Sequence, residues 1–368
     1  MITFSNPHHA LHHGKLEMFR GELVPCFEVP ARADFVLQEL VRRGLGPVQQ
    51  PQVASTPGPP SSPITSLQAA HQPVAAAALA AIHTPRYLDF LAHAWDEWVA
   101  LDPANAAKDA FPSLWPVRSF RTDVLPANFS ARMGLFSFDA GSPITSGTWE
   151  AARAGADCAV MAAQHVASGA RAAFALTRPP GHHAGADFFG GYCFLNNAAL
   201  AAQHLRNSGL QRVAVLDIDY HHGNGTQAIF YDRSDVLFAS IHGDPHTEYP
   251  FYLGYADEVG TGAGHGFNLN LPLPRGTGFA QWRAALALAL QRIAKFGAQA
   301  LVVSLGLDTF EGDPISGFTL RSEDYFRVGE DIAKAGLSTV FVFEGGYAVA
   351  ELGVNAVYVL EGFEQVAA

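Results

Sequence analysis

The sequence predicts an α/β fold built on a parallel β-sheet with helices on both faces. From about residue 146 onward, short and continuously apolar runs alternate with segments of helical periodicity. A strand buried on both faces gives such an apolar run, and an intervening helix returns the chain to the start of the next parallel strand. Charged residues are only 15% of the 368 residues and hydrophobic ones are 49%, which is typical of a compact folded protein.

The predicted elements follow in chain order. Residues 2–4 form a first strand, and residues 32–41 and 85–100 have the apolar spacing of helices. Five helices then each precede a strand. The helices are predicted at 147–168, 194–207, 226–232, 279–296 and 322–335, and the strands that follow them at 172–176, 213–216, 236–241, 300–307 and 339–343.

Three stretches do not alternate in this way. Residues 51–66 are rich in Pro and Ser and indicate a surface loop. Residues 101–146 are long, irregular and rich in Phe and Trp, which favours a lid or a subunit contact. Residues 243–265 are rich in Gly, His and Tyr and follow a predicted strand end.

Charge and cysteine content exclude several classes of protein. The net charge is −11 without a basic block, which argues against nucleic-acid binding and would favour a small cationic substrate. The three cysteines form no CxxC pair, so neither a disulfide framework nor a thiolate zinc site is expected. The sequence shows no signal-peptide pattern and no apolar run long enough to span a membrane, and we expect a cytoplasmic protein.

Two strand ends carry metal-type ligands. Asp219 and His221 follow the apolar run at 213–216, and residues two apart on an extended backbone point the same way. Asp308 follows a second apolar run at 302–307. Two carboxylates and one imidazole leave a coordination position open, which is the arrangement that catalytic zinc requires for water or substrate.

Two further strand ends add groups that could act on an amide. Adjacent imidazoles, His182 and His183, follow a Pro-Pro-Gly turn, and Tyr347 follows a Gly-Gly turn after Glu344. In open parallel sheets, sites form at the carboxyl ends of the strands. A metal, paired histidines and a phenol together suit hydrolysis of an amide bond.

These residues lie in strings that closely resemble the zinc-dependent histone deacetylase family: RPPGHHA, GGYCFLNNAA, LDIDYHHGNGTQ, SLGLDTFEGDP and EGGY. Within that family, KLEMFRGELVPCFEVPARA, GTWEAA and HGDP resemble bacterial acetylpolyamine amidohydrolases. The resemblance covers almost the whole chain. It implies one domain over residues 1–368 with the arginase–deacetylase fold, an eight-stranded parallel sheet flanked by helices, and a long inserted loop at about 101–146.

The resemblance also implies a role for each site residue. Zinc would be bound by Asp219, His221 and Asp308. The paired histidines would be His182, supported by contact with Asp217, and His183, supported by contact with Asn224. Tyr347 would be the phenol that polarises the carbonyl. Because only Asp217 supplies a charge, the two imidazoles should differ in proton affinity. His183 would be the main acid and base, and His182 its electrostatic partner.

Monovalent cations, K⁺ or Na⁺, are a further implication of the resemblance. One site near the zinc would use Asp217, Asp219, His221, Ser240 and the Ile241 carbonyl. A second site would use the backbone oxygens of Phe230, Arg233, Val236 and Phe267. The substrate channel would be walled by Tyr192 and Tyr249, and Gly190 and Gly191 would let the substrate pass close to the backbone.

The inserted loop departs from the pattern of polyamine-specific members, which place acidic residues, mainly Glu, near the channel mouth. Residues 101–146 contain no Glu, and Ser130 and Gly141 fall where such residues would align. The acidic residues that could meet a distal amine instead are Asp109, Asp123 and Asp139 on the loop, and Glu17, Glu22 and Glu248 elsewhere.

The leading interpretation is a zinc amidohydrolase that removes acetyl groups from acetylated polyamines or similar small cationic amines, and that dimerises through the 101–146 insertion. The alternative is an acetyl-lysine deacetylase acting on proteins or peptides. A binuclear manganese ureohydrolase would need a second set of bridging ligands, which the sequence does not show. A non-enzymatic protein that binds an acyl ligand or acts as a scaffold would not need Tyr347 and the histidine pair.

Overall fold

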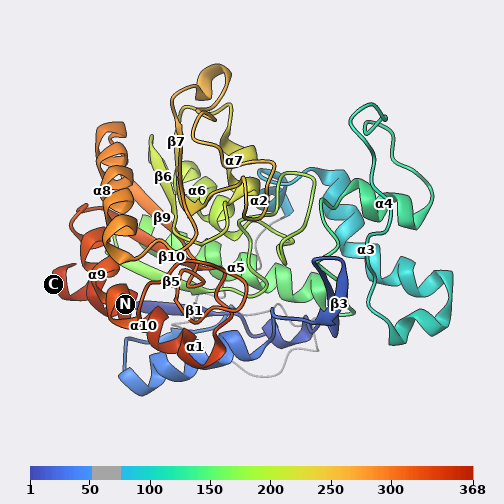
Figure 1. Cartoon of the computed structure of the whole chain (residues 1–368), viewed down its shortest axis with the longest axis horizontal. Helices are drawn as coiled ribbons and strands as arrows, with labels where there is room; N and C mark the ends of the chain where they lie inside the picture. Colours follow the sequence, from blue (N-terminus) through green and yellow to red (C-terminus); the bar gives the residue numbers. More distant parts are fainter. Residues whose placement is uncertain (52–75, 368) are drawn as a thin grey trace, which may run out of the picture.

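The computed structural model describes residues 1–51 and 76–367, so almost all of the loop expected at 51–66 lies outside the described residues. A parallel eight-stranded sheet forms the centre, in the order β4-β1-β5-β10-β9-β6-β7-β8 (Figure 1). Its strands are β1 (Ile2–Ser5), β4 (Val48–Gln49), β5 (Ala172–Leu176), β6 (Val213–Asp217), β7 (Val236–Gly243), β8 (Asn268–Leu273), β9 (Ala300–Leu305) and β10 (Ser338–Phe343). The predicted fold class is confirmed.

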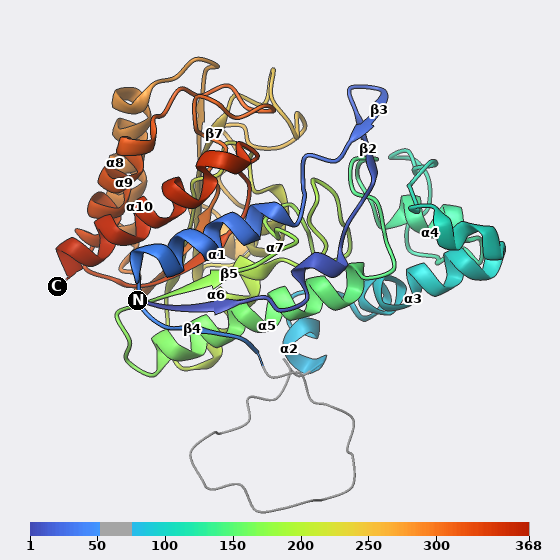
Figure 2. The same ribbon diagram turned by 90° about the horizontal axis from the view of Figure 1, so that it is seen from below.

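Helices cover both faces of this sheet (Figure 2). On one face lie α1 (Ala31–Arg43), α8 (Phe279–Phe296), α9 (Ser322–Ala333) and α10 (Val349–Ala367), and on the other lie α5 (Thr148–Ala167) and α6 (Asn197–Asn207). Successive residues of a strand point to opposite faces. Val302 accordingly packs into the apolar cluster with α5 and α6, whereas Val303 packs into the cluster with α8 and α9.

Several elements were not expected from the sequence. The edge strand β8 has the sequence NLNLPL, in which polar and apolar residues alternate, and only two of its six side chains are buried. The opposite edge, β4, is two residues long. Both lack the continuous apolar run by which inner strands are recognised. Helix α10 and the antiparallel hairpin of β2 (Leu16–Phe19) and β3 (Glu22–Pro25) were also missed.

The inserted segment is more ordered than expected. Helix α3 (Pro85–Leu101) leads into it, and it contains a short 3₁₀ turn, Pro103–Ala107, and helix α4 (Phe129–Leu135). It extends to one side of the sheet, as both views show (Figures 1 and 2). Phe129 and Phe136 are buried in the core of the same chain, and the ring centroids of Phe136 and Phe90 lie 4.9 Å apart. The described residues also include the short α-helices α2 (Ala76–Ala80) and α7 (Asn224–Phe230).

Four neighbouring strands, β5, β10, β9 and β6, occupy the middle of the sheet. The chain passes from β5 to β6 across the positions that β10 and β9 later fill, so the direction of winding changes here. Such a switch point leaves room beyond the carboxyl ends of the strands. None of the helices in the described part of the chain is long and apolar enough to cross a membrane.

Candidate active site

The loops after the four middle strands bring the expected site residues together. His182 and His183 follow β5, Asp219 and His221 follow β6, Asp308 follows β9, and Tyr347 follows β10. The strands end at the same level, because Asp217 is the register partner of Ser304, and Leu305 that of Phe343. All of the named site side chains are buried.

Asp219, His221 and Asp308 form a compact cluster. Each offers one ligand atom, and these atoms all lie within 4.8 Å of one another. The Nδ1 atom of His221 is 2.9 Å from Oδ2 of Asp308 and 3.4 Å from Oδ1 of Asp219. The backbone N–H groups of Tyr220 and Gly345 donate to the other carboxylate oxygens, at 2.7 and 2.8 Å. Both carboxylates are therefore fixed with an oxygen facing the imidazole, and this donor set suits a divalent metal such as zinc.

The cause of this convergence differs from the expected one. Strand β6 ends at Asp217, and residues 219–221 form a bend, not an extended strand. The bend is held by the N–H of His221, which donates to Oδ1 of Asp219 at 2.9 Å. Close packing against the turn after β10 also matters: a Cβ on Gly345 would lie 2.5 Å from Oδ2 of Asp219 and 2.7 Å from Oδ2 of Asp308. Only glycine fits there.

The paired histidines have different partners. The Nδ1 atom of His182 lies 3.0 Å from Oδ2 of Asp217, and that of His183 lies 2.6 Å from Oδ1 of Asn224. The two ring centroids are 4.0 Å apart. Because an amide oxygen can only accept, the short contact places the proton of His183 on Nδ1 and leaves Nε2 free to accept a proton.

Electrostatics separate the two imidazoles further. Burial alone would lower the pKa of His182, but the carboxylates of Asp219 and Asp217 outweigh burial and raise it to about 10. Burial, followed by the positive charges of His182 and His221, holds the pKa of His183 well below its usual range. The pKa of His182 therefore lies above that of His183, and His182 is the ring that binds a proton more readily.

The turn that carries Tyr347 is held by contacts with Arg32 and Asp313. Its ring lies under the guanidinium of Arg32, 4.7 Å from the ring centroid, and Nε of Arg32 donates to the carbonyl of Gly346 at 2.6 Å. Oδ2 of Asp313 accepts from the N–H of Tyr347 at 2.7 Å. Burial raises the pKa of the Tyr347 phenol well above its ordinary value, so the hydroxyl remains a hydrogen-bond donor.

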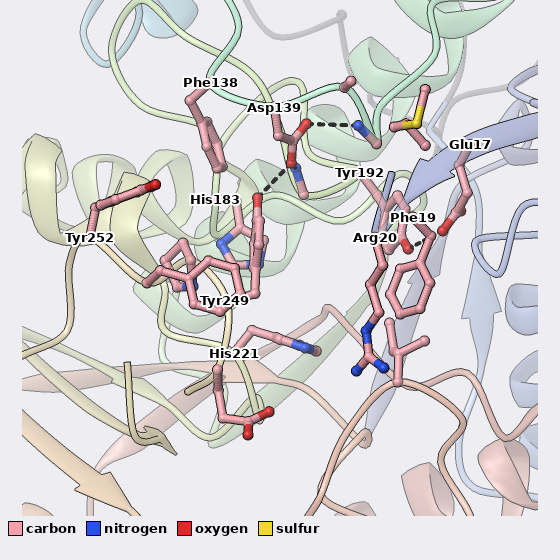
Figure 3. Close-up of a pocket in the computed structure, with 18 of the residues that line it drawn as sticks. Glu17, Phe19, Arg20, Phe138, Asp139, His183, Tyr192, His221, Tyr249 and Tyr252 are labelled. Atoms are coloured by element: carbon pink, nitrogen blue, oxygen red, sulfur yellow. Dashed lines mark hydrogen bonds between the residues drawn. The ribbon is translucent and has the colours of Figure 1, made fainter. Parts of the chain in front are cut away.

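A pocket of about 440 Å³ leads to this site. Its lining includes His183, His221 and Tyr347. Tyr192 and Tyr249 form walls (Figure 3). The rings of Tyr249 and His183 are perpendicular, with centroids 5.1 Å apart. Gly191 also lines the pocket with a left-handed φ of 55°, and a Cβ there would lie 2.3 Å from the His183 ring. Gly190 precedes it and pairs with Cys193.

Comparisons with known proteins agree with this arrangement. The model of the histone deacetylase domain matches residues 27–363. The chain belongs to the histone deacetylase family. Acetylpolyamine amidohydrolase 2 of Pseudomonas aeruginosa is 50% identical over 94% of this chain and 93% of its own length. The acetylpolyamine amidohydrolase of Mycoplana ramosa is 46% identical over 94% of both chains. The crystal structure of acetylpolyamine aminohydrolase from Burkholderia pseudomallei superposes with a TM-score of 0.89 at 38% identity, over 100% of this chain and 99% of the other.

As a histone deacetylase-family protein with amidohydrolase relatives of this similarity, the chain is a deacetylase hydrolase. The resemblance seen in the sequence is confirmed. Membership of this family implies a metal cofactor. The cluster of Asp219, His221 and Asp308 offers two carboxylates and one imidazole, which are suitable ligands for such a metal.

The residues expected to hold monovalent cations lie in two places. Asp217 and Ser240 are register partners on β6 and β7, beside the metal cluster. The second set surrounds the turn between α7 and β7, where the carbonyls of Phe230 and Phe267 accept from the N–H groups of Arg233 and Phe238, at 3.0 and 3.1 Å.

The acidic residues considered for a distal amine are spread more widely than the sequence suggested. Only Glu17, Asp139 and Glu248 line the pocket, together with Gly141. Asp109 instead accepts from the backbone of Lys15, Asp123 pairs with Arg121 on the surface, and Glu22 and Ser130 are exposed away from the pocket lining.

The sequence analysis did not identify Arg32 and Asp313, and it named Asp139 only as a possible partner of a distal amine. Arg32 is on α1, more than 300 residues from the turn that it supports. Asp139 binds the N–H of Gly191 at 2.8 Å and the phenol of Tyr249 at 2.7 Å. Asp313 could have been identified from the sequence, because it belongs to the string SLGLDTFEGDP, five residues after Asp308.

We expect the Asp313→Asn variant to lose turnover on the order of 10-fold while keeping its metal. Asp313 uses Oδ1 for the N–H of Ile315 and Oδ2 for that of Tyr347, and an asparagine can accept through only one oxygen. Hydrogen bonds to charged groups contribute roughly 1.5–3 kcal/mol, enough to misplace the phenol. The check is kcat with and without Tyr347→Phe. If Asp313 acts through the phenol, its substitution has little further effect in the Tyr347→Phe background; equal losses in both backgrounds would contradict this positioning role.

Proposed function

We propose that the protein removes acetyl groups from acetylated polyamines and similar small cationic amines, with zinc held by Asp219, His221 and Asp308. The observation that carries the proposal is the cluster of Asp219, His221 and Asp308 beside a pocket whose lining includes His183, His221 and Tyr347. The relatives named acetylpolyamine amidohydrolases support the substrate class. The net charge of −11 would also attract cations.

The chain's own residues divide the work of hydrolysis. Bound zinc would supply a Lewis acid that polarises the acetyl carbonyl and lowers the pKa of water. His183, neutral and free at Nε2, accepts the proton of the attacking water and later gives it to the departing amine. The phenol of Tyr347 donates to the carbonyl oxygen, where negative charge develops. His182, held as a cation by Asp217, stabilises that charge from beside His183. K⁺ or Na⁺ ions would be held at the two sets of residues described above and would have a structural role.

A comparison of substrates tests this function. Purified protein should be assayed with acetylputrescine, acetylcadaverine, acetylspermidine and a capped acetyl-lysine peptide, and kcat/KM compared. Higher values for the small amines support the proposal. A higher value for the peptide would favour the alternative, an acetyl-lysine deacetylase, with the same chemistry at the metal.

We also propose a homodimer formed through the 101–146 insertion. Phe129 and Phe136 are covered by the chain itself, but several apolar side chains of the insertion are exposed: Leu101, Leu114, Trp115, Val117, Phe120, Val124 and Leu125. Phe120 is 64% exposed and Val117 is 56% exposed. Full burial of such a side chain contributes roughly 1.5–3 kcal/mol, so a partner subunit would gain by covering them.

The Val117→Asp, Phe120→Asp double variant should therefore be a monomer by light scattering at micromolar concentration, whereas the wild type is a dimer. Leu288→Asp is the matched control, because Leu288 is a 55% exposed leucine on α8, on the other side of the sheet from the insertion (Figure 1). The control should remain a dimer. A monomeric wild type would contradict this assembly.

A further inference from the structure

An arginine occupies the tip of the hairpin that borders the pocket. Strands β2 and β3 are joined by the two residues Arg20 and Gly21, whose φ angles are 51° and 88°. Positive φ at both central positions is the geometry of a type I′ turn, which Asn, Asp and Gly fill most readily. A side chain with a Cβ costs free energy in this conformation. The geometry of the turn therefore does not explain an arginine at position 20, whereas a function of its side chain would.

The guanidinium of Arg20 reaches into the pocket. Arg20 lines the pocket together with Glu17, Met18 and Phe19 of the same hairpin, and its side chain points towards the side on which His221 lies (Figure 3). Its guanidinium carbon lies 5.0 Å from the centroid of the Phe19 ring. Within residues 1–51 and 76–367, no carboxylate lies close enough to form an ion pair with it. The five donors of the guanidinium are thus available to a ligand.

The carboxylates of the same pocket are already engaged by the protein. Glu17 and Asp139 each accept a phenol hydrogen bond at 2.7 Å, from Tyr192 and Tyr249. Burial also raises the pKa of Glu17 to about 7, so its negative charge is weakened near neutral pH. Glu248 pairs with an arginine on a neighbouring loop at 3.2 Å. The carboxylates of the pocket walls are therefore bonded to other side chains of the protein, whereas the guanidinium of Arg20 has no such ion-pair partner among the described residues.

We propose that Arg20 is a carboxylate-binding residue at the pocket mouth, through which the protein also accepts Nω-acetylated diamino acids. The far end of such a molecule carries a carboxylate and an ammonium group. The planar fork of the guanidinium matches the carboxylate. This inference rests on the proposed deacetylase function and adds zwitterionic amino acids to its cationic substrates.

Two substrates that differ by one group isolate this effect. Nε-acetyl-L-lysine and N-acetylcadaverine have the same acetylated chain, and only the first has a carboxylate. The wild type should hydrolyse both substrates. In Arg20→Gly, which suits the turn, kcat/KM for Nε-acetyl-L-lysine should fall roughly 5-fold, the upper range for an exposed ion pair. The value for N-acetylcadaverine should stay level or rise, because a repelling charge has been removed. The loss should shrink at high salt.

Arg327→Ala is the control, because Arg327 is an exposed arginine on α9 that neither lines the pocket nor lies on the insertion. It should leave the ratio of the two kcat/KM values unchanged. The same ratio in the wild type and Arg20→Gly, with both substrates hydrolysed, would overturn the role of Arg20 and leave the deacetylase function intact. Hydrolysis of neither substrate, nor of acetylspermidine, would instead overturn the proposed function and this inference with it.

Discussion

Replacing Tyr347 by phenylalanine is expected to lower kcat by about 10²–10³ without loss of folding or metal. The substitution removes one hydroxyl, and loss of a donor to a developing oxyanion typically costs this much. The ring itself would remain in place, because Arg32 packs over its face and its backbone is held by Asp313. The measurement is kcat on an acetylated amine, alongside metal content and the melting temperature.

Tyr192→Phe is a suitable control for Tyr347→Phe. Tyr192 also presents a phenol to the pocket, and its ring centroid lies 5.6 Å from that of Tyr347, but its hydroxyl is bound to Glu17. Its loss should alter KM more than kcat. An unchanged kcat in Tyr347→Phe, or an equal fall in kcat in both variants, would rule out a specific role for the Tyr347 phenol in the transition state.

The inner strands and the residues that follow them could be predicted because the same pattern encodes both. A strand buried on both faces shows a continuous apolar run, and the first polar residues after it lie at the carboxyl edge of the sheet. Asp219 and Asp308 were found in this way. The edge strands β4 and β8 could not be found, because β4 is two residues long and β8 alternates polar and apolar residues, so neither has a continuous apolar run.

Other parts of the site depend on packing between segments that are distant in the sequence. Arg32 supports the turn before Tyr347 from α1, and nothing in the local sequence of either segment indicates the contact. Asp139 is one of several acidic residues of the insertion, and only the folded chain shows that it binds Tyr249 and Gly191 while Asp123 stays on the surface. The two-residue spacing of Asp219 and His221 was interpreted as an extended strand, and this explanation of their convergence was wrong. A bend held by hydrogen bonds brings the two side chains together.

The second large effect is expected from Asp308→Asn, which should abolish zinc binding and activity together while the fold persists. Asparagine has the shape of aspartate and keeps an oxygen for the N–H of Tyr220, so the buried donor is not orphaned. It removes the negative charge that faces Nδ1 of His221 at 2.9 Å. Since loss of a residue that merely supports a ligand costs about 10–100-fold in metal affinity, loss of a charged ligand should cost more.

Metal titration followed by thermal unfolding separates the loss of a zinc ligand in Asp308→Asn from a loss of folding. A ligand present at 100 times its dissociation constant adds about 2.7 kcal/mol to native stability. The metal-free wild type should therefore melt at a higher temperature when zinc is added, and Asp308→Asn should not respond at the same zinc concentration. His183→Ala is the control: His183 is not one of the clustered ligands, so this variant should respond to zinc like the wild type and yet lose turnover. A zinc response of wild-type size in Asp308→Asn would show that Asp308 is not a ligand, whereas a low melting temperature before zinc is added would point to folding.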